Sequence, residues 1–308
     1  MKDQKKIYYT VAVVTYNSSK TILETLESVS RQTYKNIELI ISDDCSKDNT
    51  LAICEEWVHK NKDKFARTKI LVSKENTGIS PNRNRCVREA SGEWIKFVDG
   101  DDMLTPSSIE SYVNRIEDDI HCIMGKYYIL KNQQDKTEST IDCDLLNSTA
   151  SEQLMRQEQK MFISWPGLSF RTETWLALGG MDERFPMLDD SPFIIKVLEA
   201  GYKFHGLDEF VFIYRIHAAS AQRSMGFHIS HVNYVNLVLV PKYKRRKKYI
   251  DYWHDKWWSK KELLKIEGKN IRSNFVYLLM LLTDSKEWKY LIRDKVYRPI
   301  VFYWRRRL

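Results

Sequence analysis

Glycine is scarce in this 308-residue chain, which holds 11 glycines and no glycine-rich loop. It contains neither a GxGxxG nor a Walker-type sequence, the loops whose backbone N–H groups usually cradle phosphates. The sequence therefore excludes the common glycine cradles. A phosphate-bearing ligand would be held through a metal ion and through Arg or Lys side chains instead.

Cysteine is sparse as well, and its spacing forms no pattern. The five cysteines are Cys45, Cys54, Cys86, Cys122 and Cys143. Their odd number and the lack of any CxxC pair argue against a disulfide framework and against a zinc site. We expect reduced thiols in a cytoplasmic protein.

Long apolar runs are missing too. The longest covers residues 275–282, far short of the roughly 18 residues that suggest a membrane span. The basic segment MKDQKKIYYT leads straight into an alternating strand pattern, so we do not expect a signal peptide. A hydrophobic content of 43% and a charged content of 29% are typical of a folded soluble protein.

Positive charge is concentrated at one end of the chain. Residues 231–308 hold 20 Lys and Arg against 7 Asp and Glu, a net charge of +13. The preceding residues hold 29 against 34, a net charge of −5. A mildly acidic body with a strongly basic tail indicates two tasks in one chain.

The first hundred residues alternate between strand and helix patterns. Apolar, β-branched segments predict strands at Ile7–Thr15, Ile37–Ser42, Lys69–Ser73 and Trp94–Val98. Helical periodicity predicts helices at Thr21–Arg31, Leu51–His59 and Ser80–Ala90. Such alternation is typical of a parallel, doubly wound sheet, in which ligands bind beyond the carboxyl ends of the strands.

The later segments are less regular. Residues 105–147 predict a helix followed by two or three strands. After them we expect a strand at Trp165–Phe170, helices at Thr172–Leu178 and Ser191–Ala200, and a strand at Tyr202–Ile216. We place a domain boundary near residue 225. It separates a catalytic domain of residues 1–225, with halves 1–104 and 105–225, from a basic, aromatic-rich helical extension of residues 226–308.

Polar residues follow four of the predicted strands. They are Thr15, Tyr16, Asn17, Asp43, Asp44, Asn76 and the run Asp99-Gly100-Asp101-Asp102. Three carboxylates within four residues repel one another unless a cation compensates them, and Mg²⁺ or Mn²⁺ prefers such oxygen ligands. The alternative is a surface turn in which Asp caps the helix at Pro106.

Several motifs in series resemble one enzyme family. The segments VVTYN, IISDDCSKDNT, ENTGISPNRN and ASGEWIKFVDGDDMLTP follow the order and spacing of inverting family 2 glycosyltransferases of GT-A fold. The resemblance covers roughly residues 7–217. It implies an α/β fold with a GT-A (Rossmann-like), doubly wound, mostly parallel sheet. The basic helical extension expected at the C-terminal end of this chain lies beyond the resemblance.

The resemblance also implies roles for individual residues. It assigns the nucleotide to Thr15, Tyr16, Asn17, Asp43, Asp44, Asn76, Gly78, Arg83 and Asp99. Within this set Asp44 would meet a uracil edge, and Arg83 matches the arginine of the usual Ala-Arg-Asn triplet, with Asn82 in place of alanine. Asp99 and Asp101 resemble the DxD pair. Asp101 and Asp102 would hold Mn²⁺ or Mg²⁺. His217, where the family often has a histidine, would ligate this metal or contact a phosphate, and a structural role is the alternative.

On the acceptor side, GGMDERFPMLDD resembles the segment in which an acidic pair follows Gly-Gly-Phe-Asp-Glu, with Met181 in place of phenylalanine. Asp190 matches the catalytic base, with Asp189 beside it on the acceptor side. An inverting transfer needs one carboxylate to take the proton of the attacking hydroxyl. Capping of the following helix is the alternative role, and both can hold. Trp165 would line the acceptor site or pack in the core.

The basic tail predicts a partner with negative charge. Residues 242–249 hold six cations, and Trp and Tyr residues follow among lysines. This mixture favours an anionic membrane surface, which places the protein in the cytoplasm or on the inner face of the cell membrane. Nucleic acid is the rival partner, an uncommitted solvated face is the neutral alternative, and the aromatic helices would also suit a homo-oligomer interface.

Three functions compete. The first is an inverting glycosyltransferase that joins a nucleotide-sugar donor to a glycan or polyprenyl-linked glycan of a surface polysaccharide. The second is a sugar nucleotidyltransferase, which would ordinarily show a glycine-rich loop after the first strand, where VVTYNSSK has none. The third is a scaffold that binds nucleic acid or membrane, but the acidic strand ends would repel a polyphosphate unless a metal intervened. The donor sugar stays open, and Asp44 favours a uracil base.

Overall fold

The computed structural model describes residues 6–131, 135–139, 141, 143–159, 163–188, 190–216, 225–239, 241–242, 259–264 and 266. Two compact units make up the chain, residues 1–220 and residues 221–308. Of the predicted site residues, Asp189 and His217 lie outside the described residues. The same holds for most of the basic segment 242–249.

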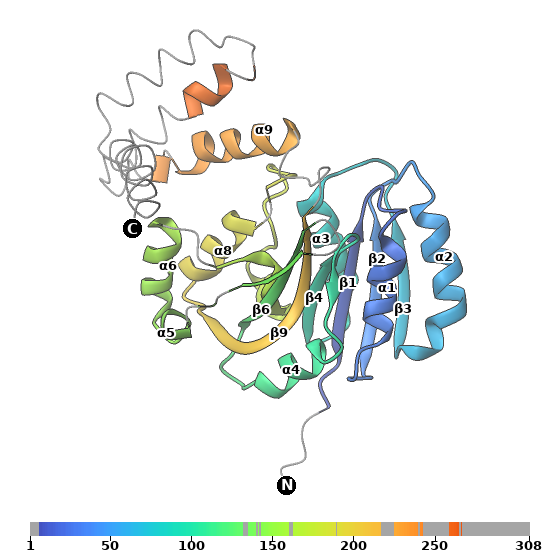
Figure 1. The fold of residues 1–308 in the computed structure, drawn as a ribbon. Coiled ribbons are helices and arrows are strands. Elements are labelled where there is room, and N and C mark those ends of the chain that lie inside the picture. The colour runs from blue at the N-terminus through green and yellow to red at the C-terminus, as the bar shows by residue number, and fades with distance from the viewer. Residues whose placement is uncertain are drawn as a thin grey trace, which may run out of the picture. The chain divides into compact units, whose positions relative to one another are not determined.

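The first unit is built on one sheet. Its strands in the described residues are β1 Tyr9–Thr15, β2 Ile37–Asp43, β3 Arg67–Val72, β4 Trp94–Asp99, β5 Met103–Leu104, β6 Cys122–Lys131, β7 Asp135–Glu138, β8 Leu168–Arg171 and β9 Phe204–Ile216. They lie in the order β3-β2-β1-β4-β8-β6-β9-β5, and β7 pairs with β6 (Figure 1). β3, β2, β1 and β4 are parallel, which confirms the doubly wound half of the prediction.

The register of these parallel strands brings their carboxyl ends together. Thr15 of β1 pairs with Asp43 of β2, and Val14 of β1 pairs with Asp99 of β4. Asp43 in turn pairs with Val72 of β3. The polar segments after the four strands therefore leave one edge of the sheet side by side.

Helices cover both faces of the sheet. They are α1 Ile22–Ser30, α2 Thr50–Asn61, α3 Ile79–Glu89, α4 Ser108–Arg115, α5 Cys143–Leu146, α6 Ala150–Gln159, α7 Thr172–Ala177 and α8 Asp190–Glu199, with 3₁₀ turns η1 Lys62–Lys64 and η2 Trp165–Gly167. One core cluster joins the strands to α1, α2 and α4. The other joins them to α3, α7 and α8. Each face of the sheet thus has its own core, as alternating strands and helices require.

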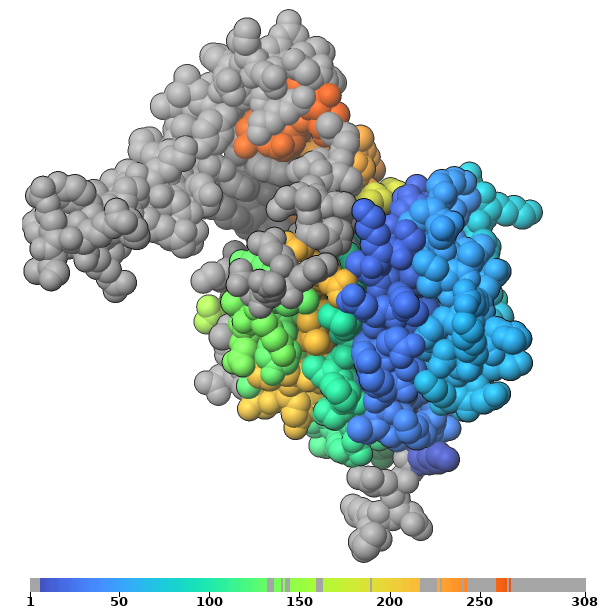
Figure 2. Space-filling view, turned by 45° about the vertical axis from the view of Figure 1, so that its right-hand side comes forward, coloured from blue at the N-terminus to red at the C-terminus, as the bar shows by residue number. Residues whose placement is uncertain are grey.

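The second half of the sheet mixes antiparallel and parallel pairs. β8 pairs antiparallel with β4 and with β6, whereas β6 and β9 run parallel over a long register. The predicted strand at Trp165–Phe170 begins with η2, and β8 starts only at Leu168. Pro166 has no N–H to offer a strand partner, which fits a turn at this point. Figure 2 shows the early part of the chain, blue to cyan, beside the green surface of the later part.

The described residues of the second unit are helical. α9 spans Met225–Tyr234, a π-helical turn (η4) spans Val235–Leu239, and residues 259–264 are also helical. Among the residues that the structure describes in either unit, no helix combines the length and apolar character needed to cross a membrane.

Candidate functional site

Backbone hydrogen bonds join the loops at the carboxyl edge of the parallel strands. The N–H of Asp44 donates to the carbonyl of Thr15, and the N–H of Gly100 donates to that of Val14, both at 2.9 Å. The hydroxyl of Thr21 donates to the carbonyl of Gly100 at 2.8 Å. The structure therefore brings together the predicted residues after β1, β2 and β4.

Gly100 lies where these loops approach most closely. A Cβ at this position would be 2.6 Å from Oγ1 of Thr15 and 2.9 Å from Oγ of Ser18. Real Cβ atoms do not approach other atoms this closely. A larger residue in place of the glycine in the acidic run would therefore force the side chains of Thr15 and Ser18 to move.

Arg83 holds the first carboxylate of the acidic run. Its Nη2 donates to Oδ1 and Oδ2 of Asp99 at 2.7 and 3.1 Å. The Arg83 side chain is buried, and its guanidinium lies 4.3 Å from the ring centroid of Trp165. This ion pair fixes Asp99 while leaving its carboxylate about a third exposed, with a side-chain exposure of 36%.

Trp165 belongs to an aromatic cluster beneath Arg83. Its ring lies 6.0 Å from that of Phe97 and 5.6 Å from that of Phe170. The indole therefore supports the arginine that holds Asp99. Acceptor binding by Trp165 stays a prediction.

Asp102 is the buried member of the acidic run. Its Oδ1 accepts the backbone N–H of Arg215 at 2.7 Å, which ties the run to the last residues of β9. Burial raises the pKa of Asp102 well above its usual value, and the charges of Asp101 and Asp99 raise it further. The Arg215 N–H and the ammonium group of Lys96 oppose this rise. A cation bound beside this carboxyl would favour its ionised form.

The carboxylates of the acidic run fit a hard divalent cation that also binds the phosphates of a substrate. Among the described residues, no group of three or more His, Cys, Asp or Glu side chains is arranged to hold a metal ion. Asp101 and Asp102 instead supply two carboxyl groups that are adjacent in sequence, and the pKa of Asp102 is raised first by burial and then by the charges of Asp101 and Asp99. Mg²⁺ and similar hard ions are commonly held by one or two carboxylates together with the phosphates of a substrate. The residues present fit that arrangement.

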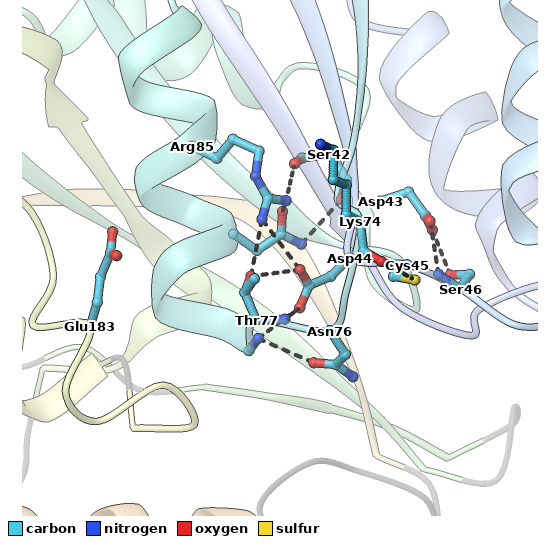
Figure 3. Close-up of polar contacts among 12 residues, drawn as sticks. Ser42, Asp43, Asp44, Cys45, Ser46, Lys74, Asn76, Thr77, Arg85 and Glu183 are labelled. Carbon is cyan, nitrogen blue, oxygen red and sulfur yellow. Dashed lines mark hydrogen bonds and ion pairs between the residues drawn. The ribbon is translucent and has the colours of Figure 1, made fainter.

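Asp44 is bonded to the chain itself through both of its carboxylate oxygens (Figure 3). Oδ2 accepts the N–H of Thr77 at 2.9 Å and that of Gly78 at 2.7 Å. Oδ1 accepts the hydroxyl of Thr77 at 2.7 Å and lies 3.4 Å from Nη2 of Arg85. The side chain therefore fixes the turn that contains Asn76 and Gly78, whose N–H is also 3.1 Å from Oδ1 of Asn76.

The loops after β1 and β2 are fixed to each other by side chains. Oδ2 of Asp43 accepts the N–H of Ser46 at 2.9 Å. Oγ of Ser46 accepts the N–H of Asn17, and Oδ1 of Asn17 accepts the N–H of Lys47. Asn17 has a φ of 51°, a left-handed conformation that asparagine tolerates better than most residues. Tyr16 beside it is exposed.

Asp190 is the first residue of α8 and is half-buried. The loop that leads to it, the α7–α8 loop (residues 178–188), contacts the start of α3. The hydroxyl of Ser80 lies 3.4 Å from the carbonyl of Leu188, two residues before Asp190. Because α3 begins just after the Asn76–Gly78 turn, the predicted base begins its helix at the same edge of the sheet.

Residues absent from the sequence prediction also shape the site. Lys96 is buried, and its Nζ donates to the carbonyls of Pro166 and Leu168 at 2.5 and 3.1 Å. Arg85 joins Asp44 to Thr77. A charged residue in the middle of the apolar segment WIKFV was the available signal for Lys96. Nothing in the sequence indicated the partner of Arg85.

Comparison with known proteins agrees with this geometry. Residues 10–175, more than half of the chain, match the model of Glycosyl transferase family 2. Glycosyltransferase GlyG of Streptococcus pneumoniae is 33% identical over 119 residues, 38% of this chain and 38% of GlyG. UDP-Glc:alpha-D-GlcNAc-diphosphoundecaprenol beta-1,3-glucosyltransferase WfgD of Escherichia coli is 32% identical over 127 residues, 40% of this chain and 48% of WfgD. The matches span less than two thirds of either relative.

A solved structure shows the same fold. TarS 1-349 of S. aureus in complex with UDP-GlcNAc superimposes with a TM-score of 0.60 at 21% identity, over 75% of this chain and 66% of TarS 1-349. The fold is that of the GT-A glycosyltransferases, as the motifs predicted. Family model, motif order and sheet topology agree, and the chain belongs to Glycosyl transferase family 2.

Proposed function

We propose that this protein transfers a sugar from a nucleotide-diphosphate donor, a UDP-sugar, to a hydroxyl of a glycan or lipid-linked glycan. The transfer inverts the anomeric carbon. One observation carries the proposal: the acidic run Asp99–Asp102 lies at the edge where the parallel strands end, with Arg83 bonded to Asp99. The family membership and the names of GlyG and WfgD support the same activity.

The donor would lie across the ends of β1, β2, β3 and β4. Thr15, Tyr16 and Asn17 would line the base and ribose from one side, and the Asn76–Gly78 turn from the other. Asp99, fixed by Arg83, would accept hydrogen bonds from the ribose hydroxyls. Asp43 and Asp44 would keep the loops beside the nucleobase in place through their bonds to Ser46, Thr77 and Gly78.

Asp101, Asp102 and His217 would hold Mn²⁺ or Mg²⁺. Such an ion, when bound, neutralises charge on the departing diphosphate. The chain's own contribution is to fix the carboxylates. The backbone N–H of Arg215 donates to Asp102, which holds the last residues of β9, two positions before His217 in the sequence, at the acidic run.

Asp190 would act as the base. As the acceptor oxygen bonds to the anomeric carbon, the bond from that carbon to the donor phosphate oxygen breaks, and the hydroxyl proton passes to the Asp190 carboxylate. The nucleoside diphosphate leaves with the electron pair of the broken bond. Asp189 and Trp165 would contact the acceptor.

The acceptor would be a glycan of surface polysaccharide synthesis, and the name of WfgD, which gives a diphosphoundecaprenol-linked acceptor for that enzyme, supports a lipid-linked form. A lipid-linked acceptor lies at a membrane, and the tail with its net charge of +13 supplies attraction to an anionic surface. The protein would then work from the cytoplasm on the inner face of the cell membrane.

The test is turnover of a panel of sugar nucleotides by wild-type protein and by Asp190→Asn. We expect wild type to release nucleoside diphosphate from one donor and Asp190→Asn to lose transfer while binding UDP and Mn²⁺ as wild type does. Asp208→Asn is the matched control, because Asp208 is an exposed carboxylate of β9 that pairs with Lys126 and should be dispensable. Survival of turnover in Asp190→Asn contradicts the base assignment. Pyrophosphate release from a nucleoside triphosphate and a sugar phosphate would favour the nucleotidyltransferase.

A further inference from the structure

Three consecutive residues of α3 contact three different segments around the site. Successive helical residues point about 100° apart, so Arg83, Asn84 and Arg85 fan out around the helix. Arg83 bonds to Asp99, and Arg85 reaches toward Asp44 and Thr77. Figure 3 shows Arg85 on one side of α3 and Glu183, from the α7–α8 loop, on the other. Asn84 is the residue that meets this loop.

The amide of Asn84 is fully used in that contact. Its Oδ1 accepts the N–H of Met181 at 2.9 Å and the indole N–H of Trp175 at 3.2 Å. Its Nδ2 donates to the carbonyl of Met181 and to Oε1 of Glu183, both at 2.9 Å. Two donors and two acceptor sites are all that an asparagine amide offers. The side chain is only 5% exposed, so each lost bond would leave a buried group unpaired.

Gly180 allows the loop to close on this amide. Its φ is 69°, and a Cβ at this position would lie 2.5 Å from Oδ1 of Asn84. Both the backbone conformation and the space therefore require glycine. Nothing larger than hydrogen fits between the loop and Asn84.

The remainder of the α7–α8 loop is bonded to α3 one turn earlier. The N–H of Ser80 donates to the carbonyl of Pro186 at 3.0 Å, and its hydroxyl lies 3.3 Å from the carbonyl of Phe185. Asn84 thus holds residues 181–183, and Ser80 holds residues 185–188. Asp190 begins α8 two residues after Leu188, so its position depends on how the loop packs on α3.

We propose that Asn84 is a positioning residue that sets Asp190 relative to the donor-binding edge. One helix, α3, would then hold three parts of the site in fixed relative positions. They are Asp99, the Asn76–Gly78 turn beside the nucleobase, and the proton acceptor Asp190. The inference rests on the proposed function for the role of Asp190, whereas the anchoring of the loop does not. A misplacement of about 1 Å in reacting groups costs about 100-fold in rate.

The test compares wild type with Asn84→Asp, which keeps the shape but removes both donors and places a second charge beside Glu183. Gly180→Ala disturbs the same contact from the loop side and provides a second route should Asn84→Asp fold poorly. Arg88→Met is the matched control, because Arg88 reaches the same Glu183 in an exposed ion pair worth little. Hydrogen exchange and steady-state kinetics are both measured.

We expect faster exchange of the backbone amides of residues 181–185 in both variants, because Asn84→Asp loses the bonds of Nδ2 to the Met181 carbonyl and to Glu183 and Gly180→Ala pushes the loop away from the helix. Exchange at Asp99–Asp102 should be unchanged. We also expect kcat to fall about 100-fold while the donor KM and UDP affinity stay within about threefold of wild type. Arg88→Met should match wild type. Unchanged exchange in the variants overturns the anchoring. An unchanged kcat, or a UDP affinity that falls as far as kcat, overturns the positioning role. If wild type transfers no sugar from any donor, the proposed function fails, and exchange alone decides the anchoring.

Discussion

The carboxylate of Asp44 offers a sharp test of what holds the Asn76–Gly78 turn, which would lie beside the nucleobase. It accepts two backbone N–H groups through Oδ2, and the Thr77 hydroxyl through Oδ1, with Arg85 close by. The perturbations are Asp44→Asn and Asp44→Ala. Both act on a side chain with 2% exposure, so water cannot replace the lost bonds.

The structure gives different magnitudes for the two changes. In Asp44→Asn the amide oxygen can face the two backbone N–H groups, and the Thr77 hydroxyl can turn to accept from the new NH₂. The hydrogen bonds lose the contribution of the negative charge, and the Arg85 contact is lost. Together these losses should lower the unfolding free energy by about 2 kcal/mol. Asp44→Ala leaves two buried N–H groups unpaired and should cost about 4 kcal/mol. For a unit of this size, that larger loss lowers the unfolding temperature by about 10 °C.

The assay is urea unfolding at neutral pH together with UDP affinity by calorimetry. Both variants should lose stability and UDP affinity because the Asn76–Gly78 turn moves. Asp44→Ala should lose more of each than Asp44→Asn. Glu38→Ala is the matched control. Glu38 is a buried carboxylate that accepts from Thr10, Arg67 and Ser91 toward the other end of the strands, so it should lose stability without losing UDP affinity.

The reasoning is refuted if Asp44→Asn is as stable as wild type. If such a stable variant also lost UDP affinity more than about tenfold, the carboxylate would act on the base itself. That result would support the uracil contact predicted from the sequence over the loop-anchoring role.

Two further predictions concern Lys96 and the basic tail. Burial lowers the pKa of Lys96 to about 7, although the charges of Asp99 and Asp102 oppose this shift. As the pH rises, the native protein therefore loses this proton before the unfolded protein, in which the lysine pKa is 10.5. The unfolding free energy of wild type relative to Lys96→Met should therefore rise by about 3 kcal/mol between about pH 7 and about pH 9.5, measured by urea unfolding; a flat difference would contradict the burial of the ammonium. In liposome sedimentation, replacement of the six cations in residues 242–249 by Gln should reduce binding to anionic vesicles at least about 100-fold, at about 1 kcal/mol per cation. Equal binding to neutral and anionic vesicles would rule out the membrane contact.

The parallel half of the fold was predictable because its strands carry their own signal. β2 was expected at Ile37–Ser42 and spans Ile37–Asp43, and β4 was expected at Trp94–Val98 and spans Trp94–Asp99. Continuous β-branched and apolar segments specify strands buried on both faces. The convergence of polar strand ends then followed from topology alone.

α6 was not predicted, for a reason visible in its packing. Its sequence ASEQLMRQEQ is mostly polar. Its buried Gln153 instead pairs with β9, accepting the N–H of Phe204 and donating to its carbonyl, both at 2.9 Å. A side-chain amide that bonds to a strand leaves no hydrophobic pattern for the sequence to show.

The site was predictable as a set of residues and not as a set of contacts. The sequence placed Arg83 and Asp99 in one site, but their pairing needs α3 to lie against β4. Likewise, the saturation of Asp44 by the Asn76–Gly78 turn depends on a contact 33 and 34 residues away in the chain. Spacing predicts which residues share an edge, whereas partners depend on tertiary packing.

The most direct measurement of the central claim is heat unfolding of the full chain with UDP, with Mn²⁺, and with both. A site built from carboxylates and a base-side turn should bind the nucleotide and the metal together. At about one hundred times the dissociation constant, the pair should add about 2.7 kcal/mol and raise the unfolding temperature by about 8 °C. Protection by UDP and Mn²⁺ together, beyond either alone, is the predicted result. Protection by a nucleoside triphosphate alone, with none from UDP and Mn²⁺, would contradict a nucleotide-sugar transferase.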